Sequence, residues 1–478
     1  MPNIGIMSFI RYKKFGNKEY AYEVTAYWDS QKKKSRQKSK YLGIVVDKEK
    51  GIYKKKEVKN DIERLILDFG DVYILHEFMK NIKLHNVLHE VFSTRVEYLL
   101  LIYYRLCYPS AMKYARTWYQ GNIAQLLFKD IDLSSQRISD FLEAISDESL
   151  QRNFFKNYIS SFIQSKEGVI IDTTALPNQI HFPFNAWGYS DGEIEKQIRF
   201  LFVIDKDSSL PLYFRYLPGN IVDVSSLNTT VEELKMFGIK SSFILIDAGF
   251  FSEDNIKELY TENIDFLTRL PSSRKLYKNL VKEEVSNIES VKNAVRYGKR
   301  GLFIKQKKIE LFEKKAYAHI VLDPERKGRE TRKLLINILE EEEINEEHIE
   351  FKLMKCGIMI LVSSFEIEKS NVVPFYYMRQ LVEILFGFSK DDLDILPLRV
   401  HKEETLRGYL LLMFMTLIVF VLFRKAIGDS YTVEEVLLTM RNLKCKVYES
   451  KAIIQELTKQ QKDIMKKLDL IVPKKMGV

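Results

Sequence analysis

The sequence predicts a mixed α/β protein made of several domains, and three observations lead to that prediction. The chain has 478 residues, more than one ordinary domain holds, and 46% of them are hydrophobic, enough to bury a large core. From residue 169 onward, short apolar runs typical of buried strands alternate with amphipathic helical segments. Glycine and proline are scarce, at 20 and 11 residues, which argues against a linker-rich or collagen-like chain.

The cysteines and the apolar stretches bear on the cellular compartment. Only Cys107, Cys356 and Cys445 occur, with no paired spacing, so we expect reduced thiols in a cytoplasmic protein. Residues 1–10 precede the first cations, which is the reverse of a secretory signal. The most apolar stretch, Tyr409–Phe423, has 15 residues, fewer than the roughly 18 of a membrane span. We therefore interpret it as a buried core helix and expect no membrane partner.

Residues 1–60 are predicted to form a basic, strand-rich arm. They carry 16 Lys/Arg and 6 Asp/Glu, a net charge of +10, whereas the other 418 residues sum to −1. Strand-like runs at Tyr20–Trp28 and Tyr41–Val46 would form a hairpin with a basic tip. Such a tip can reach a phosphate backbone, so we expect contact with nucleic acid; a solubilising tail is the alternative. The tip residues that we expect to bind DNA are Lys32, Lys33, Lys34, Arg36 and Lys38.

The rest of the chain is predicted to hold a helical part and an interrupted α/β core. Residues 61–165 show helical periodicity and would form either a DNA-reading or a plain support domain. Core strands are expected at 169–172, 197–204, 210–216, 242–247 and 264–269. We predict core segments at 166–270 and 366–430, a β-rich insertion at 271–365 between them, and a helical tail at 431–478.

Two aspartates follow buried strands, and they mark the candidate site. Asp172 ends Val169-Ile-Ile-Asp172, and Asp247 ends Phe243-Ile-Leu-Ile-Asp247. An aspartate cannot rest unpaired in an apolar core, so each should emerge at the carboxyl edge of the sheet, where α/β proteins bind ligands. Capping of the next helix or turn is the alternative for each. Converging carboxylates suit Mg²⁺ or Mn²⁺.

A later helix could supply the third carboxylate. At ~100° per residue, Tyr376, Arg379, Glu383 and Lys390 lie within about 60° of one another on one helix face. A phenol, two cations and a carboxylate would then project together toward the sheet edge. A solvent-exposed polar stripe is the alternative. The sequence contains no glycine-rich phosphate loop, so we expect no nucleotide cofactor.

These four positions and both aspartates resemble a known family, the DDE transposases of bacterial insertion sequences. One group of this family is marked by the signature Tyr-x2-Arg-x3-Glu-x6-Lys, and this sequence matches it at all four positions. Asp172-Thr-Thr, Asp247-Ala-Gly and the segment Pro218-Gly-Asn220-Ile-Val-Asp223 resemble the family's other motifs. Gly387 departs from it, because many relatives are expected to carry a basic residue there.

The resemblance implies a ribonuclease H-like core and a metal-dependent enzyme that cleaves DNA at element ends and joins the freed 3′-hydroxyl to target DNA. It implies two Mg²⁺ (or Mn²⁺) ions, bridged by Asp172 and completed by Asp247 and Glu383. Arg379 and Lys390 would then hold phosphates, and Tyr376 would contact the DNA near the cleaved end.

The expected partner is double-stranded DNA, both the inverted-repeat ends and the target, in a bacterial cytoplasm near the nucleoid. Trp187, shortly after the first aspartate, could stack on DNA or pack within a hairpin. Joining two ends calls for at least a homodimer on DNA, with the apolar tail residues Val436, Leu437, Met440 and Leu443 as a possible contact or as packing on their own domain. A nuclease without strand transfer and a silent DNA-binding descendant are the alternatives.

Overall fold

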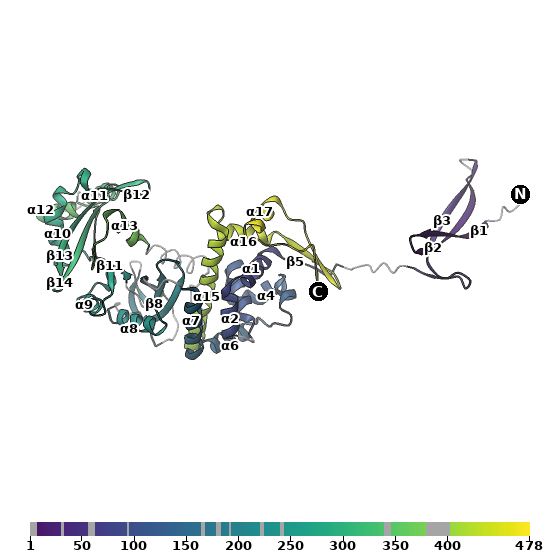
Figure 1. Ribbon diagram of the computed structural model, residues 1–478, viewed down its shortest axis with the longest axis horizontal. Coiled ribbons are helices and arrows are strands. Elements are labelled where there is room, and N and C mark those ends of the chain that lie inside the picture. The colour runs from purple at the N-terminus through teal and green to yellow at the C-terminus, as the bar shows by residue number, and fades with distance from the viewer. Residues whose placement is uncertain are drawn as a thin grey trace. The chain divides into compact units, whose positions relative to one another are not determined.

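The computed structural model describes residues 7–29, 33–55, 63–92, 95–163, 168–177, 183–190, 193–219, 224–239, 243–338, 346–378 and 402–478. The chain divides into two compact units, Met1–Arg64 and Leu65–Val478 (Figure 1).

The first unit is a four-stranded antiparallel sheet in the order β1-β2-β3-β4. Its strands are β1 (Met7–Phe15), β2 (Lys18–Asp29), β3 (Lys34–Asp47) and β4 (Ile52–Lys54). Gly43 lies in β3 with φ 144°, and a Cβ there would meet the Lys54 backbone at 2.8 Å, so a side chain would push β4 away. Among the described residues of this unit, Ala21 and Val24 are its buried hydrophobic side chains. Such a small core leaves most of the sheet's basic side chains exposed and its other apolar side chains exposed or half-buried.

The second unit is built on a ten-stranded mixed sheet in the order β12-β13-β14-β15-β11-β10-β6-β8-β7, with β9 also paired to β8. Its first strands are β6 (Gly168–Pro177), β7 (Ala186–Ser190), β8 (Glu193–Asp205), β9 (Pro211–Pro218), β10 (Phe243–Ile246) and β11 (Asp265–Arg269). Strands β6, β10 and β11 run parallel, while β8 and β9 run antiparallel to their neighbours. This is the ribonuclease H-like arrangement that the sequence resemblance implies. Helices α8 (Val224–Met236) and α9 (Glu253–Thr261) connect its strands.

The inserted segment differs from the β-rich insertion expected at 271–365. Its strands β12 (Ala294–Tyr297), β13 (Arg300–Leu311), β14 (Lys314–Leu322) and β15 (Ile358–Ser363) continue the central sheet beyond β11. It also contains the helices α10 (Lys275–Glu284), α11 (Pro324–Ile338) and α12 (Glu346–Lys355). The physical reason is the largely apolar β15, whose six residues are all buried because it pairs with β11 on one side and β14 on the other.

The helical part agrees with the expectation for 61–165. After β5 (Leu65–Asp68), its helices are α1 (Gly70–Asn81), α2 (Lys83–Phe92), α3 (Glu97–Cys107), α4 (Ala115–Gln120), α5 (Ala124–Leu127), α6 (Ser135–Ile145) and α7 (Glu148–Phe162). Helix α15 (Glu403–Ile427) packs against α3 and α6 of this group and against β9 of the sheet, and Figure 1 shows it beside α7 near the sheet. Helix α15 joins the helical part to the core.

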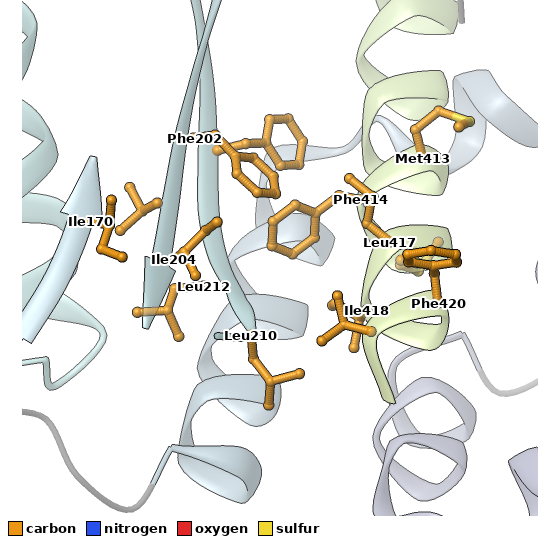
Figure 2. Packing of buried hydrophobic residues seen from close by; sticks show 14 of the residues in the cluster. Ile170, Phe202, Ile204, Leu210, Leu212, Met413, Phe414, Leu417, Ile418 and Phe420 are labelled. Carbon is orange, nitrogen blue, oxygen red and sulfur yellow. The ribbon is translucent and has the colours of Figure 1, made fainter. Parts of the chain in front are cut away.

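Helix α15 confirms the interpretation of Tyr409–Phe423 as a buried core helix. Its 25 residues extend past the apolar run at both ends, and by length and composition it could cross a membrane. In its most apolar window, however, 78% of the residues are buried inside the protein. Figure 2 shows Phe414 pointing from α15 toward Phe202 of β8, and their ring centroids are 5.6 Å apart. The helix is apolar because it packs against protein on most of its circumference.

The tail corrects the expectation of a helical segment at 431–478. It contains α16 (Val433–Arg441) and α17 (Lys459–Lys467), but also β16 (Lys444–Val447), β17 (Lys451–Ile454) and β18 (Lys475–Gly477), in a sheet with β5. The Phe69 and Gly70 amides both donate to the Leu443 carbonyl, which fixes α16 on α1. Of the two interpretations of its apolar residues, the structure supports packing on their own unit, because four of them are buried there: Val436, Leu437, Met440 and Leu443.

Candidate active site

The two aspartates lie on neighbouring parallel strands in the same register. Strands β6 and β10 pair Ile171 with Ile246. The residue that follows each of them is an aspartate, Asp172 after Ile171 and Asp247 after Ile246. Neighbouring strands are roughly 4.8 Å apart, and residues in register point to the same face of the sheet. The structure therefore brings both predicted carboxylates to one place at the carboxyl edge.

Neither aspartate caps the following helix. Asp172 is 7% exposed, lies inside β6 opposite Phe202, and accepts a hydrogen bond from the Thr173 amide at 2.9 Å. Asp247 follows β10, and its side chain makes no capping bond to the short 3₁₀ turn after it. The capping of α9 is supplied by Ser252, whose Oγ accepts from the Asn255 amide at 3.2 Å. Helix capping therefore does not explain the position of either aspartate.

Helix α13 (Lys369–Tyr377) brings the first residue of the helical signature to this edge. The Tyr376 hydroxyl donates to Asp247 Oδ1 at 3.5 Å, and the Tyr376 side chain is buried. The signature therefore meets the second aspartate across 129 residues of sequence. Its other members, with Gly387, lie outside the described residues, so the shared helix face stays a prediction for Arg379, Glu383 and Lys390.

A buried polar network holds the connection that leads into α13, and the sequence did not lead us to expect it. His319 of β14 is fully buried, its Nδ1 is 3.0 Å from Gln306 Nε2, and its Nε2 is 2.8 Å from Ser363 Oγ. Gln306 Nε2 also donates to the Ile367 carbonyl, and Ser363 Oγ donates to the Phe365 carbonyl, both at 2.6 Å. Two carbonyls between β15 and α13 are thereby fixed by side chains from three strands.

The donors in this network define the state of the histidine. An amide nitrogen can only donate, so Nδ1 of His319 accepts and its Nε2–H donates to Ser363. Burial lowers the pKa of His319 to about 4, so the ring is neutral near pH 7. A polar residue within the apolar run of residues 316–322 was the sequence signal that could have indicated it.

Trp187 lies away from the two aspartates. It belongs to β7, opposite Lys196 of β8, and is 63% exposed, so it does not pack within a hairpin core. Lys196 Nζ lies 5.8 Å from the centre of its ring. The β8 partner of Asp172 is Phe202, six residues further along, a separation of roughly 20 Å at the usual rise per residue. The structure thus does not place Trp187 beside the aspartates.

The basic side chains of the first unit form a ladder. Lys34, Arg36 and Lys38 occupy alternate positions of β3, so they share one face of the sheet. Arg36 Nε is 3.3 Å from Asp29 Oδ2, so part of its charge is balanced. Lys33 precedes the strand with φ 46°, in the left-handed region of a tight turn, and Lys32 lies outside the described residues.

The carboxylate pair is chemically suited to a divalent metal ion. Two adjacent carboxylates at a sheet edge offer hard oxygen ligands, the donor type that Mg²⁺ and Mn²⁺ prefer. Within the described ranges, no group of three or more His, Cys, Asp or Glu side chains is placed to hold a metal, and Glu383 lies outside those ranges. The carboxylate oxygens of Asp172 and Asp247 fit the expected Mg²⁺ or Mn²⁺ ions.

Comparison with known proteins identifies the family. The family model described as "Transposase DDE domain" matches residues 163–419, more than half of the chain. The chain therefore belongs to the family of proteins with a transposase DDE domain. This domain has a ribonuclease H-like core. It occurs in nucleases and strand-transfer enzymes, which generally use divalent metals. No curated protein matches the chain.

Ten chains of solved structures match this chain, and two of them are described here. The first is a cryo-EM structure of a piggyBac transposase synaptic complex with hairpin DNA, at 10% identity and a TM-score of 0.43, covering 78% of this chain and 79% of that one. The second is a Drosophila P element transposase strand transfer complex, at 12% identity and a TM-score of 0.17, covering 63% of this chain and 81% of that one.

Proposed function

We propose that the protein is a transposase of a bacterial insertion sequence, which cleaves phosphodiester bonds at the element ends and joins the 3′-hydroxyl to target DNA. The observation that carries the proposal is the pairing of Asp172 and Asp247 in one register row, with Tyr376 of the signature helix on Asp247. Membership of the DDE family supports the reaction class.

The site residues have separate roles in this proposal. Asp172, Asp247 and Glu383 would hold two Mg²⁺ or Mn²⁺ ions, which when bound supply Lewis-acid activation of the attacking and leaving oxygens. Tyr376 donates to Asp247 Oδ1 and so fixes the orientation of that carboxylate, which makes it a positioning residue as well as a proposed DNA contact. Arg379 and Lys390 would bind phosphate oxygens of the substrate.

The partner and its binding surfaces follow from charge. We propose double-stranded DNA, with the arm at 1–60 contacting phosphates through the β3 ladder and Trp187 stacking on a more distant part of the DNA. The helical part at 61–165 would support or read the DNA. Two protomers would assemble on the two element ends, in a bacterial cytoplasm at the nucleoid.

Three substitutions and one control test the proposal. Asp172→Asn, Asp247→Asn and Glu383→Gln should each abolish end cleavage while DNA binding stays near the wild-type level, because only a metal ligand is removed. Asp254→Asn, an exposed carboxylate on α9, should cleave like the wild type. Cleavage and joining are measured on duplexes that carry the element ends, with Mg²⁺ or Mn²⁺ and then with excess chelator.

The outcomes separate the proposal from its rivals. Cleavage by the wild type in excess chelator would refute the metal site. Metal-dependent cleavage that never yields joined product would favour a nuclease without strand transfer. Wild-type protein that binds the ends without cleaving them would favour a silent DNA-binding descendant.

A further inference from the structure

A basic groove lies on the inserted part of the second unit, between α11 and α12. It has a volume of about 430 Å³, and its floor includes Tyr277, Cys356 and Ile358. Helix α11 contributes positions 326, 330, 333, 334 and 337, the spacing of one helix face. The cationic residues that line the groove are Arg269, Arg326, Lys333, Lys352 and Lys355.

The five cations face one carboxylate, and that carboxylate is already engaged. Glu330 Oε1 is 2.6 Å from Arg326 Nε, and its Oε2 accepts from the Gly357 amide at 2.7 Å. Burial raises the pKa of Glu330, but the Gly357 amide and the guanidinium groups of Arg326 and Arg269 lower it overall. Among the described residues, the other four cations of the groove have no carboxylate within ion-pair distance. The groove therefore keeps an excess of positive charge and suits an anion.

The groove begins at the same sheet edge as the catalytic aspartates. Strands β10 and β11 pair Ile246 with Thr268, so the next residues, Asp247 and Arg269, occupy the same row. Thr268 Oγ1 donates to the Asp247 carbonyl at 3.4 Å, which ties the two strand ends together. With strands roughly 4.8 Å apart, the Arg269 backbone lies about 10 Å from that of Asp172.

We infer that this groove binds phosphates of the DNA backbone next to the bond that is cleaved. One DNA strand carries a phosphate every 3.4 Å or so of helix axis, so a strand leaving the aspartates toward β11 would reach Arg269 within about three nucleotides. The groove that Arg269 lines is also lined by Lys333, Lys352 and Lys355. Lysine and arginine side chains around an open groove are the usual contacts to phosphate oxygens. The inference rests on the proposed function, because it takes the aspartates as the cleavage site.

The test compares two double variants of the full-length protein that remove the same charge. Lys352→Ala with Lys355→Ala removes two cations from the groove, whereas Arg329→Ala with Arg332→Ala removes two exposed cations of α11 that do not line it. Binding to a random-sequence DNA duplex is measured over a range of salt concentrations. If both lysines contact phosphates, the log–log salt slope should become flatter by about 1.8 in the groove variant and stay near the wild-type value in the control. Both variants should melt like the wild type, because all four side chains are at the surface.

Each other outcome overturns the inference. An unchanged slope in the groove variant, or an equal change in both variants, would show that the groove makes no specific phosphate contact. If inorganic pyrophosphate binds the wild type but not the groove variant while the DNA slope is unchanged, the groove is a small-anion site. End cleavage by the wild type is assayed separately, so a failure here leaves the proposed function standing.

Discussion

Substitution of His319 should reduce the loss of stability that the protein suffers in acid. The neutral ring accepts from Gln306 and donates to Ser363, and both partners hold carbonyls of the connection to α13. Protonation would place an N–H at Nδ1 against the Gln306 amide, donor against donor. Turning that amide to present its oxygen would break its bond to Ile367. The folded protein therefore resists protonation of His319.

The magnitude follows from the difference in pKa. Burial lowers the pKa of His319 from 6.5 to about 4, so the unfolded chain binds a proton in a pH range where the folded protein does not. His319 therefore does not change the free energy of unfolding above a pH of about 6.5, and it lowers this free energy as the pH drops toward 4. Linkage gives a loss of about 2 kcal/mol at pH 5, approaching about 3 kcal/mol below pH 4. His76 is half-buried, and partial burial also lowers its pKa to about 4, so it should add a further loss.

The assay is chemical unfolding of the wild type and of His319→Gln at pH 7.5 and pH 5. A glutamine can accept and donate in place of the ring but does not titrate, so the variant should lose about 2 kcal/mol less between the two pH values. His89→Gln, on the exposed face of α2, serves as the control and should follow the wild type. If His319→Gln loses as much stability in acid as the wild type, the buried neutral ring is not the acid-sensitive group and the reasoning is wrong.

Two further predictions concern the arm and the helical part. Alanine at Lys34, Arg36 and Lys38 should flatten the salt slope of DNA binding by about 0.9 for each phosphate that the arm no longer neutralises; an unchanged slope would make the arm a solubilising tail. Asp71 is buried and pairs with Arg441 at 3.2 Å, so Asp71→Ala should lower the unfolding free energy by about 3 kcal/mol by leaving that cation partly buried and unpaired. Glu90→Ala, at an exposed carboxylate of α2, should change it by less than about 0.5 kcal/mol, and an equal effect in both variants would contradict the role of the buried pair.

The sequence was informative where burial leaves a local pattern. Strands β6, β10 and β11 are buried on both faces, so they appear as short apolar runs, and the polar residue after each of the first two marks the sheet edge. The paired positions of Asp172 and Asp247 were predictable for this reason. The approach of Tyr376 to Asp247 was implied only through the family resemblance, because no local pattern specifies a contact between segments so far apart.

Pairing between distant segments could not be predicted in the same way. The strands of the insertion were expected, but not their place in the central sheet, because strand pairing depends on partners that the sequence does not name. In the tail, β16 and β17 are four residues each and mix lysine with apolar residues. Such short segments show no clear strand pattern, so residues 431–478 were predicted to be helical throughout. Strand β5, the partner of β16, precedes it by more than 370 residues, and β17 pairs with β16 in turn. Only this pairing between distant segments makes them strands.

The continuity of the sheet explains how an insertion can lie between two parts of one active site. A separate domain on flexible connections would leave the direction of α13 undetermined. Here β15 pairs directly with β11, whose end is bonded to Asp247 through Thr268. Only residues 364–368 separate β15 from α13, and the Gln306–His319–Ser363 network fixes two of their carbonyls. The helix that begins the signature is therefore aimed at the aspartates by the same sheet that carries them, and we expect damage to this network to reduce cleavage more than DNA binding.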